Sequence, residues 1–497
     1  MTTRLLPNTS AQPVWRRAGM RALESHLQAA CPAPLMDLAG LATARLARAV
    51  APHARRIWIV AGPGNNGGDG LEAAIHLQQE GCHVQLSLLG DPQRLPADAR
   101  RAFERATRAD VDIQTGLPDC PPELGTQDLC IDALLGIGAA RAPQGDLLQA
   151  IEWLNASAAS VLAIDLPTGL DADSGQPLGS LESVVQADHT LTFLGAKPGL
   201  FMGHGRDACG TLWLAPLADG ANTADAPLPD AELNPPTDPA SRQHASHKGS
   251  HGDVAVVGGE SVGTHGTGMT GAAVLAAQAA LHGGAGRVML CLLGEQDCIP
   301  SATADLMRRD LQALDLPQLT VVAGCGGGHS IAQPLGRLLQ HSARLVLDAD
   351  ALNRVAEDAW LQRLLTERGA RQRPTVLTPH PLEAARLLGI ATTDVQADRL
   401  EAAQQLARRF DCCVVLKGSG TVIAAPGQTP RINTTGNGLL ATGGTGDVLA
   451  GLIGARLATT GQAWLAACDA VWTHGQQANA WPQDEALTAS RLAARLR

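Results

Sequence analysis

The chain has 497 residues, which is more than one ordinary hydrophobic core holds and predicts two domains. Apolar residues make up 45% and charged residues 17% of the sequence, a composition typical of an α/β enzyme rather than of a disordered or fibrous chain. The net charge of -10, the absence of tyrosine and the lack of a lysine or arginine run argue against a nucleic-acid-binding surface, and no apolar run reaches membrane-spanning length.

The cysteines and the N-terminus indicate a cytoplasmic protein. Eleven cysteines are scattered without a C-x-x-C pair, so the sequence predicts neither a zinc site nor a disulfide framework. We expect most of them to be small buried hydrophobic residues. No basic stretch followed by an apolar core is found in residues 1–15, so no secretory signal is expected.

The first half begins with a predicted strand, loop and helix unit. Ile57–Val60 is expected to form a buried strand, residues 61–70 a glycine-rich loop, and the following residues a helix that ends near Glu80. The loop satisfies G-x-G-x-x-G, and Asp91 follows at roughly the spacing of a ribose-binding acid, which is weak evidence for dinucleotide binding. The loop segment Asn65-Asn66-Gly67-Gly68-Asp69 adds carboxamides and a carboxylate, whose oxygens suit a hard cation.

Two further segments place an aspartate at the end of an apolar strand. These are residues 131–138, with Asp132, and residues 163–171, with Asp165. Ligands of open α/β sheets bind at the carboxyl ends of the strands, so Asp69, Asp132 and Asp165 are expected to face one crevice. The alternative is that each aspartate caps the next helix or turn.

A change in composition predicts the domain boundary. Between Leu217 and Ser246 the residues Ala, Asp, Pro, Asn and Thr dominate and apolar periodicity is lost. We therefore expect a first domain over 1–217, a linker over 218–245 and a second domain over 246–497. In both halves short apolar runs alternate with helical stretches, which predicts parallel sheets covered by helices.

The second half contains three candidate site segments. His380 lies between two prolines, with Glu383 three residues later in a position to orient a magnesium-bound water, although an isolated histidine is more often structural. Lys417 follows the apolar run Cys413–Leu416 and precedes glycine, an arrangement suited to phosphate binding or simply to a strand-end turn.

The third segment, Thr442–Gly451, is the most informative. Its sequence is Thr-Gly-Gly-Thr-Gly-Asp-Val-Leu-Ala-Gly, a glycine-rich loop that leads through Asp447 into a helical stretch. Free N–H groups and the helix dipole favour an anion there. A bound phosphate and burial would raise the pKa of Asp447 and suit it to remove a proton from an attacking hydroxyl. The alternative is a plain helix-capping aspartate.

Together these motifs resemble two known families. The NNGGDG segment and the two aspartate segments are similar to the YjeF N-terminal domain, the epimerase of hydrated NADH and NADPH, over about residues 10–217. Residues 246–252, 377–383, 416–421 and the GTGD segment resemble the ADP-dependent NAD(P)H-hydrate dehydratases of the ribokinase-like superfamily. Both halves in this order resemble the bifunctional NAD(P)H-hydrate repair enzymes. The resemblance implies two three-layer α/β/α domains, the first Rossmann-like and the second ribokinase-like.

The resemblance also assigns residues to an epimerase site. It implies that Asp165 is catalytic and that potassium is bound by Asn66, Asp132 and Thr168. Lys197 would add charge near the substrate phosphates, although a solvated surface lysine is the expected alternative. The substrate-binding residues implied are Asn65, Asn66, Gly67, Gly68, Asp69, Gly136, Ile137, Gly138, Ala139, Ala140, Arg141, Ala142 and Asp165.

A dehydratase site is implied for the second half. Asp447 would be its base, and magnesium and ADP its cofactor and cosubstrate. Residues implied to bind the hydrate are Ala272, Gly326, His380 and Asp447. Residues implied to bind ADP or AMP are Lys417, Gly418, Ser419, Gly420, Thr421 and Gly446.

The implied chemistry is repair of hydrated nicotinamide nucleotides. The C6 hydroxyl of the S hydrate would attack the terminal phosphoryl group of ADP, and loss of phosphate would regenerate NADH or NADPH with AMP as the other product. One departure is Gly324-Cys-Gly-Gly-Gly328, where the family often has Gly-Pro-Gly-Leu-Gly, and residues 261–271 are unusually rich in Gly, Thr and His. The alternatives are a small-molecule kinase, an NAD-dependent dehydrogenase and a non-enzymatic sensing or scaffold role of the first half. A homo-oligomer is compatible with the sequence.

Overall fold

The computed structural model describes residues 2–218, 226–237, 243–265, 268–294 and 304–496. The chain divides into two compact units, residues 1–8 with 12–231 and residues 9–11 with 232–497. Part of the expected linker is structured, because β10 (Ala231–Leu233) pairs in parallel with β19 (Arg431–Ile432). Other parts of it, 219–225 and 238–242, lie outside the described residues, as do residues 266–267 of the Gly-, Thr- and His-rich segment.

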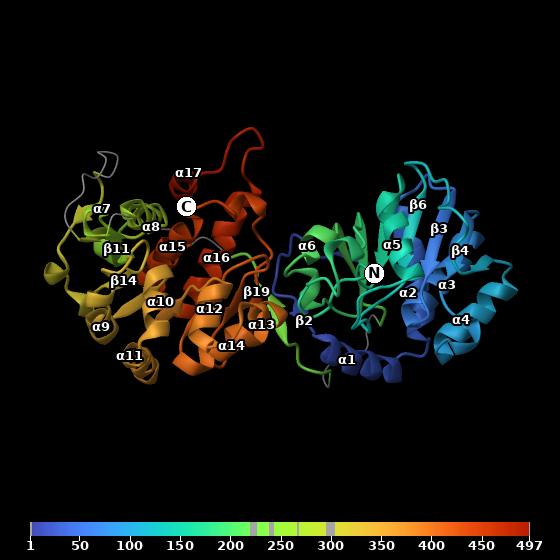
Figure 1. Cartoon of the computed structure of the whole chain (residues 1–497), viewed down its shortest axis with the longest axis horizontal. Coiled ribbons are helices and arrows are strands. Elements are labelled where there is room, and N and C mark those ends of the chain that lie inside the picture. Colours follow the sequence, from blue (N-terminus) through green and yellow to red (C-terminus); the bar gives the residue numbers. More distant parts are fainter. Residues whose placement is uncertain (1, 219–225, 238–242, 266–267, 295–303, 497) are drawn as a thin grey trace. The chain divides into compact units, whose positions relative to one another are not determined.

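The N-terminal unit is built on one sheet (Figure 1). All neighbouring strands in it are parallel except the first pair. The order of its strands is β1 (Thr3–Arg4), β9 (Thr211–Ala215), β8 (His189–Phe193), β7 (Ser160–Ile164), β6 (Leu129–Ala133), β3 (Arg56–Ala61), β4 (His83–Leu88) and β5 (Asp112–Thr115).

Helices cover both faces of this sheet because strand side chains alternate between the faces. Ile57 and Ile59 of β3 join one hydrophobic cluster, whereas Trp58 and Val60 join another. Residues of α2 (Leu35–Val50), α3 (Asn65–Gln79) and α4 (Ala97–Arg108) pack in the first cluster, and residues of α5 (Asp146–Ala156) pack in the second. The remaining elements are β2 (Pro13–Val14), α1 (Arg17–Ala30) and α6 (Gly205–Ala208).

The C-terminal unit repeats this plan with its own sheet. Its strands are parallel from β13 to β17, and β18 is antiparallel to both neighbours. Their order is β13 (Met307–Arg308), β12 (Arg287–Leu293), β11 (Asp253–Glu260), β14 (Thr320–Ala323), β15 (Arg344–Leu347), β16 (Thr375–Leu377), β17 (Cys413–Leu416), β18 (Val422–Ala424), β19 and β10.

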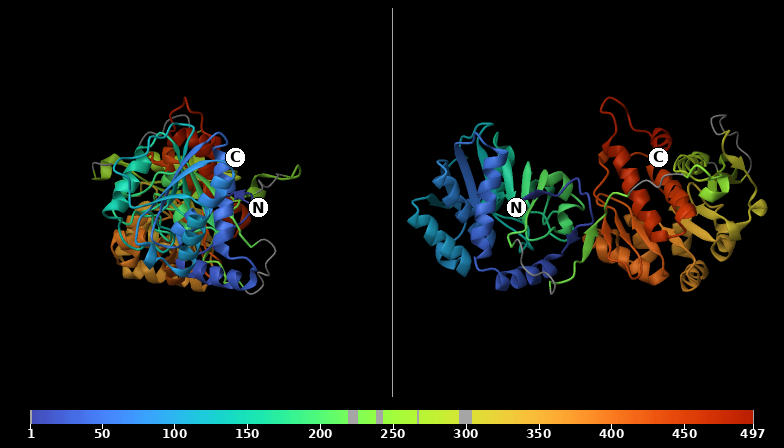
Figure 2. Two further views of the ribbon diagram at one scale, coloured as in Figure 1. Left: turned by 90° about the vertical axis from the view of Figure 1, so that its right-hand side faces the viewer. Right: turned by 180° about the vertical axis from the view of Figure 1, so that it is seen from behind.

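Two sets of helices sandwich the second sheet, as the views from the front and from behind show (Figures 1 and 2). One set packs on the cluster that contains Val254 and Val322: α8 (Thr270–His282), α15 (Thr445–Thr460), α16 (Ala463–Asn479) and α17 (Ala489–Arg495). The other set is α9 (Ala332–His341), α10 (Ala349–Glu357), α11 (Ala359–Ala370), α12 (Pro381–Leu388) and α14 (Arg399–Phe410). The short helices are α7 (Val262–His265) and α13 (Thr392–Ala397). The expected α/β class with two three-layer domains is confirmed.

One local expectation was wrong. The segment Asn65 to Asp69 is not a loop but the start of α3, whose N-cap is Gly64. A Cβ on Gly67 would lie 2.0 Å from the carbonyl oxygen of Gly62, so glycine lets the helix begin against the end of β3. Asp91 accepts a hydrogen bond from the Gln93 N–H and caps a short 3-10 helix, so its carboxylate has a structural role apart from ribose binding.

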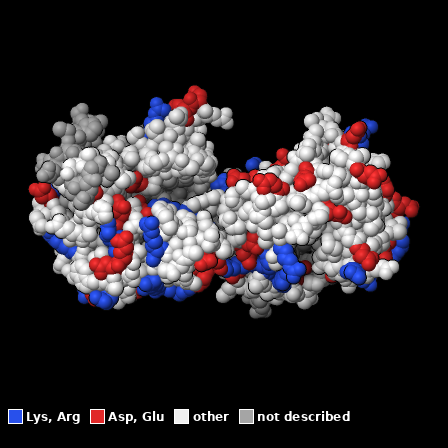
Figure 3. All heavy atoms as spheres, in the orientation of Figure 1, with Lys and Arg blue, Asp and Glu red and all other residues white. Residues whose placement is uncertain are grey.

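Most of the described cysteines are buried, and the surface carries charges of both signs (Figure 3). Eight of the ten described cysteines are buried and all ten are free, which confirms their expected packing role. Acidic and basic side chains are interspersed on the face of each unit drawn in Figure 3. Among the described helices, none has the length and apolar character needed to span a bilayer.

Candidate functional sites

A cavity of about 500 Å³ lies in the N-terminal unit at the carboxyl ends of the parallel strands. Its wall is formed by the start of α3, the segment after β6, the ends of β7 and β8, and residues of α1 and α2. Predicted residues that line it are Asn65, Asn66, Asp69, Gly136, Ile137, Gly138, Ala139 and Asp165. The predicted Gly67, Gly68, Ala140, Arg141 and Ala142 are not among the lining residues.

Asp132 and Thr168 form a buried pair behind this wall. Neither residue exposes any surface. Asp132 Oδ1 accepts from Thr168 Oγ1 at 2.8 Å and its Oδ2 accepts from the Thr168 N–H at 2.8 Å. Burial raises the pKa of Asp132 to about 6, although these hydrogen bonds favour the ionised carboxylate. The pair therefore joins the end of β6 to the segment that follows β7.

Asn66 supplies evidence for a bound group. Its side-chain Oδ1 and Nδ2 are buried and make no hydrogen bond to any residue in the described part of the chain. Burying a carboxamide without partners costs several kcal/mol, roughly 2–7 depending on the reference state, so a ligand, ion or water is expected there. A Cβ on Gly136 would lie 3.2 Å from Asn66 Oδ1 and 3.0 Å from Asp165 Oδ2, so both side chains reach the same spot.

Asp165 is held from two sides at the cavity wall. Its Oδ2 accepts from the Ile137 N–H at 2.9 Å, and its Oδ1 is 2.6 Å from Lys197 Nζ. Its φ of 68° lies in the left-handed region, which is uncommon for a residue other than glycine. Such backbone strain persists where the surroundings fix a residue for a function.

Other carboxyl groups line the same cavity. Burial and the charge of Asp165 raise the pKa of Asp69 well above its usual value, and the same two causes raise the pKa of Glu24. The cavity thus combines an ion-paired carboxylate with carboxyl groups whose pKa values are raised, and environments that move the pKa values of neighbouring carboxyl groups apart are typical of acid and base pairs. It is therefore suited to acid and base catalysis.

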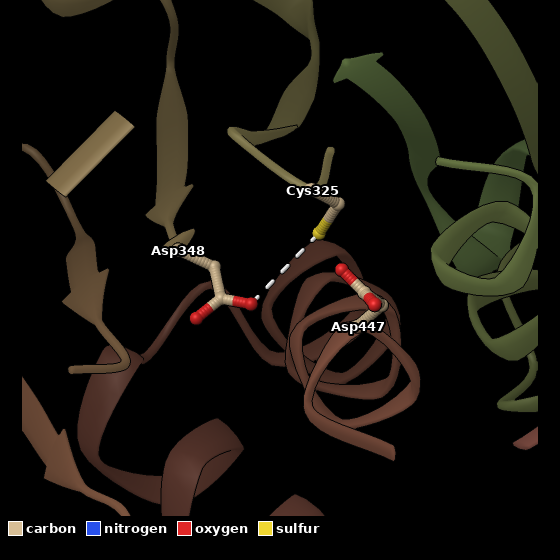
Figure 4. Close-up of side chains that lie close together, drawn as sticks. All are labelled: Cys325, Asp348 and Asp447. Carbon is tan, nitrogen blue, oxygen red and sulfur yellow. Dashed lines mark hydrogen bonds between the residues drawn. The ribbon is translucent and has the colours of Figure 1, made fainter. Parts of the chain in front are cut away.

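The C-terminal unit brings a second acidic cluster together. Atoms of Cys325, Asp348 and Asp447 lie within 4.8 Å of one another, and the three side chains point toward a common centre (Figure 4). They come from the ends of β14 and β15 and from the first turn of α15. Burial and the neighbouring Asp348 raise the pKa of Asp447 to about 6. A carboxylate with this pKa accepts a proton readily near neutral pH.

Lys417 joins this cluster. Its Nζ is 2.6 Å from Asp348 Oδ1, and a Cβ on Gly446 would lie 3.6 Å from the same Nζ. Burial opposes its charge, but Asp348 and Glu383 raise the pKa of Lys417 above its usual value. The predicted phosphate-loop lysine and the GTGD turn are thus neighbours, which is the arrangement that binding of an anionic group requires.

Arg399 shapes the loop that follows Lys417 and was not singled out in the sequence. Its Nη2 donates to the carbonyl oxygens of Leu416, Lys417 and Gly420 at 3.3, 3.3 and 3.4 Å. Burial lowers the pKa of this guanidinium to about 10. By binding three successive parts of the turn, it holds the loop of residues 417–421 in one conformation.

His380 and Glu383 have a structural role in α12. The Glu383 N–H donates to His380 Nδ1 at 3.2 Å, and the His380 N–H donates to Glu383 Oε2 at 2.8 Å. This reciprocal pair is a capping box, which stabilises the helix N-terminus. Burial opposes ionisation of Glu383, but the hydrogen bond from His380 and the charge of Lys417 hold its pKa below the usual value. The other ring nitrogen of His380, Nε2, also lies 3.1 Å from Glu383 Oε1, and 45% of the histidine side chain is exposed.

The predicted Ala272 and Gly326 are brought together beside the acidic cluster. A Cβ on Gly326, whose φ is 58°, would lie 2.9 Å from the Cβ of Ala272. His474 of α16, which had no sequence signal, lies 3.0 Å through Nε2 from the carbonyl oxygen of Thr445. Burial lowers the pKa of His474 to about 4, so the neutral ring donates this bond and supports the first turn of α15.

Comparison with known proteins gives consistent matches over both units. A family model described as YjeF-related protein N-terminus matches residues 32–199, and one described as NAD(P)H-hydrate dehydratase matches residues 254–496. A bifunctional NAD(P)H-hydrate repair enzyme of Escherichia coli is 35% identical over 463 residues, covering 90% of this chain and 84% of that protein. The bifunctional NAD(P)H-hydrate repair enzyme of Coxiella burnetii is 36% identical over 462 residues, which cover 90% of this chain and 89% of that protein. A crystal structure of an ADP/ATP-dependent NAD(P)H-hydrate dehydratase from Bacillus subtilis, co-crystallised with ATP and Mg²⁺, is 30% identical, with a TM-score of 0.45 and coverage of 52% of this chain and 91% of that one.

Proposed function

The chain belongs to the bifunctional NAD(P)H-hydrate repair enzymes, and on that premise we propose which site performs each of the two reactions. The cavity of the N-terminal unit interconverts the R and S hydrates of NADH and NADPH. The acidic cluster of the C-terminal unit dehydrates the S hydrate with ADP, giving NADH or NADPH, AMP and phosphate. The observation that supports the second assignment most directly is the position of Asp447, whose pKa is about 6, beside the Lys417 loop.

In the dehydratase site, Asp447 acts as the base. It removes the proton of the C6 hydroxyl, whose oxygen then attacks the terminal phosphoryl group of ADP, so that AMP leaves. The bond between C6 and the phosphorylated oxygen next breaks, because phosphate is a far better leaving group than hydroxide, and loss of a proton from C5 restores the double bond of the dihydronicotinamide. Lys417 and the N–H groups at the start of α15 balance the negative charge that develops on the phosphoryl oxygens.

Magnesium fits the C-terminal cluster by the chemistry of its donors. Asp348 supplies hard carboxylate oxygens, as this cation prefers, while Asp447, within 4.8 Å of it, stays the base. When bound with the nucleotide, the ion would neutralise phosphate charge. The sulfur of Cys325 is a soft donor and is not assigned to magnesium.

In the epimerase site, Asp165 moves the proton. The configuration at C6 is lost when the hydroxyl group leaves or when the ring opens. Either route requires transfer of a proton, to or from the hydroxyl oxygen or the ring nitrogen. Asp165 accepts or returns that proton, and Asn65, Asp69 and the segment after β6 hold the nucleotide. Potassium fits the unpartnered Oδ1 of Asn66 together with oxygens of Asp132 and Thr168, and it would supply positive charge beside the substrate. The expected cytoplasmic location and a homo-oligomeric state stay predictions.

The dehydratase assignment is tested with the purified S hydrate, ADP and magnesium. We expect one AMP and one phosphate for each NADPH formed, and loss of all three products in Asp447→Ala. A stable phosphorylated product without phosphate release would instead show that the C-terminal unit is a small-molecule kinase. Mass spectrometry of the reaction mixture distinguishes the two results.

A further inference from the structure

Lys197 is not the solvated surface lysine that its sequence context predicts. It follows β8 in a segment rich in glycine and proline, yet only 1% of its side chain is exposed. It is one of the largest fully buried side chains among the described residues. Burying an ammonium group is costly unless it is paired and hydrogen-bonded, so its position calls for a specific function.

All three N–H donors of the Lys197 ammonium group bind acceptors within the protein. Besides Asp165 Oδ1 at 2.6 Å, Nζ donates to Thr192 Oγ1 at 2.7 Å and to the Phe193 carbonyl oxygen at 2.9 Å. An ammonium group has three N–H donors, and all three are occupied. This leaves no donor for a substrate phosphate, which the resemblance had offered as the role of this lysine.

The three acceptors show what Lys197 does. Thr192 and Phe193 end β8, whereas Asp165 follows β7, so the lysine joins two neighbouring strand ends at the cavity wall. The second oxygen of Asp165 is held by the Ile137 N–H. Both oxygens of the Asp165 carboxylate are therefore held by hydrogen bonds, and one of the two donors, Lys197, carries the opposite charge.

We propose that Lys197 is a positioning residue of the epimerase, which fixes the Asp165 carboxylate at the cavity and supplies its counter-charge. This inference rests on the proposed epimerase function of the same cavity. Lys197 acts through Asp165 and does not touch the substrate. Without it, Asp165 would lie next to Asp69 and Glu24 with no cation in contact, and its orientation would depend on one backbone N–H.

The test compares Lys197→Met with wild type in the full-length protein, with hydrated NADPH as substrate. We expect the epimerase kcat to fall at least about 100-fold, within the range typical of lost acid and base catalysis, while KM changes less than about threefold. Arg108→Met, which removes an exposed cation of the same unit, should leave both constants unchanged. Dehydratase activity on the S hydrate, carried by the other unit, should be unchanged, and a cooperative thermal unfolding transition of the N-terminal unit reports that this unit is folded in the variant.

Opposite outcomes overturn the proposal in distinguishable ways. A raised KM with unchanged kcat would assign Lys197 to the substrate phosphate, and unchanged constants would remove it from the reaction. An inactive wild-type epimerase would overturn the proposed function, and the inference with it.

A second variant covers the case in which Lys197→Met does not fold. Lys197→Ala should recover epimerase kcat when ethylammonium is added, because the cation refills the space beside Asp165. Asp165→Ala should show no such recovery, since it lacks the group that the amine supports. Folded Lys197→Ala that gains nothing from the amine would contradict the proposal.

Discussion

Asp447 is expected to lower the stability of the C-terminal unit while it enables catalysis. Burial and Asp348 raise its pKa from 3.8 to about 6 in the folded protein. A shift of roughly 2 pH units corresponds to about 3 kcal/mol, at about 1.4 kcal/mol per unit. Because the folded-state pKa is the higher one, the folded protein binds more protons between about pH 4 and about pH 6, and its stability falls as the pH rises through this window.

Asp447→Asn removes this cost with little change in shape. The pKa of the folded state already includes the attraction between the carboxylate and the N-terminus of α15, so the whole shift counts. We therefore expect a gain of about 3 kcal/mol in the free energy of unfolding at about pH 8. At about pH 4, where wild-type Asp447 is protonated in the folded state and roughly half protonated in the unfolded state, the gain should be well under about 1 kcal/mol. Dehydratase activity should fall about 10²- to 10⁴-fold.

Calorimetry of the full-length protein at both pH values measures the effect. A gain of about 3 kcal/mol should raise the melting temperature of the C-terminal unit by roughly 6–12 °C. Asp484→Asn, at an exposed aspartate of the same unit, serves as the matched control and should not shift it. Destabilisation of Asp447→Asn at the higher pH, or an equal gain at both pH values, would refute the reasoning.

Three further variants test other parts of the two sites. Thr168→Val removes the hydroxyl that donates to Asp132 and accepts from the Leu135 N–H, so urea unfolding should show a loss of about 1–3 kcal/mol in the N-terminal unit. Gly136→Ala places a methyl group 3.0 Å from Asp165 Oδ2 and should slow epimerisation about 100-fold without affecting the dehydratase, as steady-state rates of each reaction would show. Arg399→Met frees the loop after β17 and should raise the KM for ADP about tenfold in nucleotide titrations; an unchanged KM would mean that the loop holds its shape unaided.

Local patterns predicted the sheets and the strand-end aspartates well. Apolar runs fix the strands, and parallel strands bring their carboxyl ends to one edge, so Asp132 and Asp165 could be assigned to one region before their contacts were known. The GTGD segment likewise indicated a helix start with a proton-accepting aspartate. Asp447 does lie in the first turn of α15 with a raised pKa.

Long-range contacts account for what the sequence did not predict. Lys197 lies in a segment rich in glycine and proline, and its burial depends on the contact with Asp165, 32 residues earlier in the chain. Arg399 and His474 act on backbone carbonyl groups, which leave no trace in sequence patterns. The start of α3 at Asn65 was missed because two glycines argue against a helix, whereas close packing against Gly62 makes glycine necessary there.

The most direct test of the bifunctional assignment is the recovery of reduced nicotinamide absorbance from a mixture of the R and S hydrates of NADPH, with ADP, magnesium and potassium. Wild type should convert the whole mixture, whereas Asp165→Asn should stop once the S fraction is consumed, apart from slow spontaneous epimerisation. Complete conversion by Asp165→Asn at the wild-type rate, or a wild type that itself stops at the S fraction, would contradict the account of the N-terminal unit.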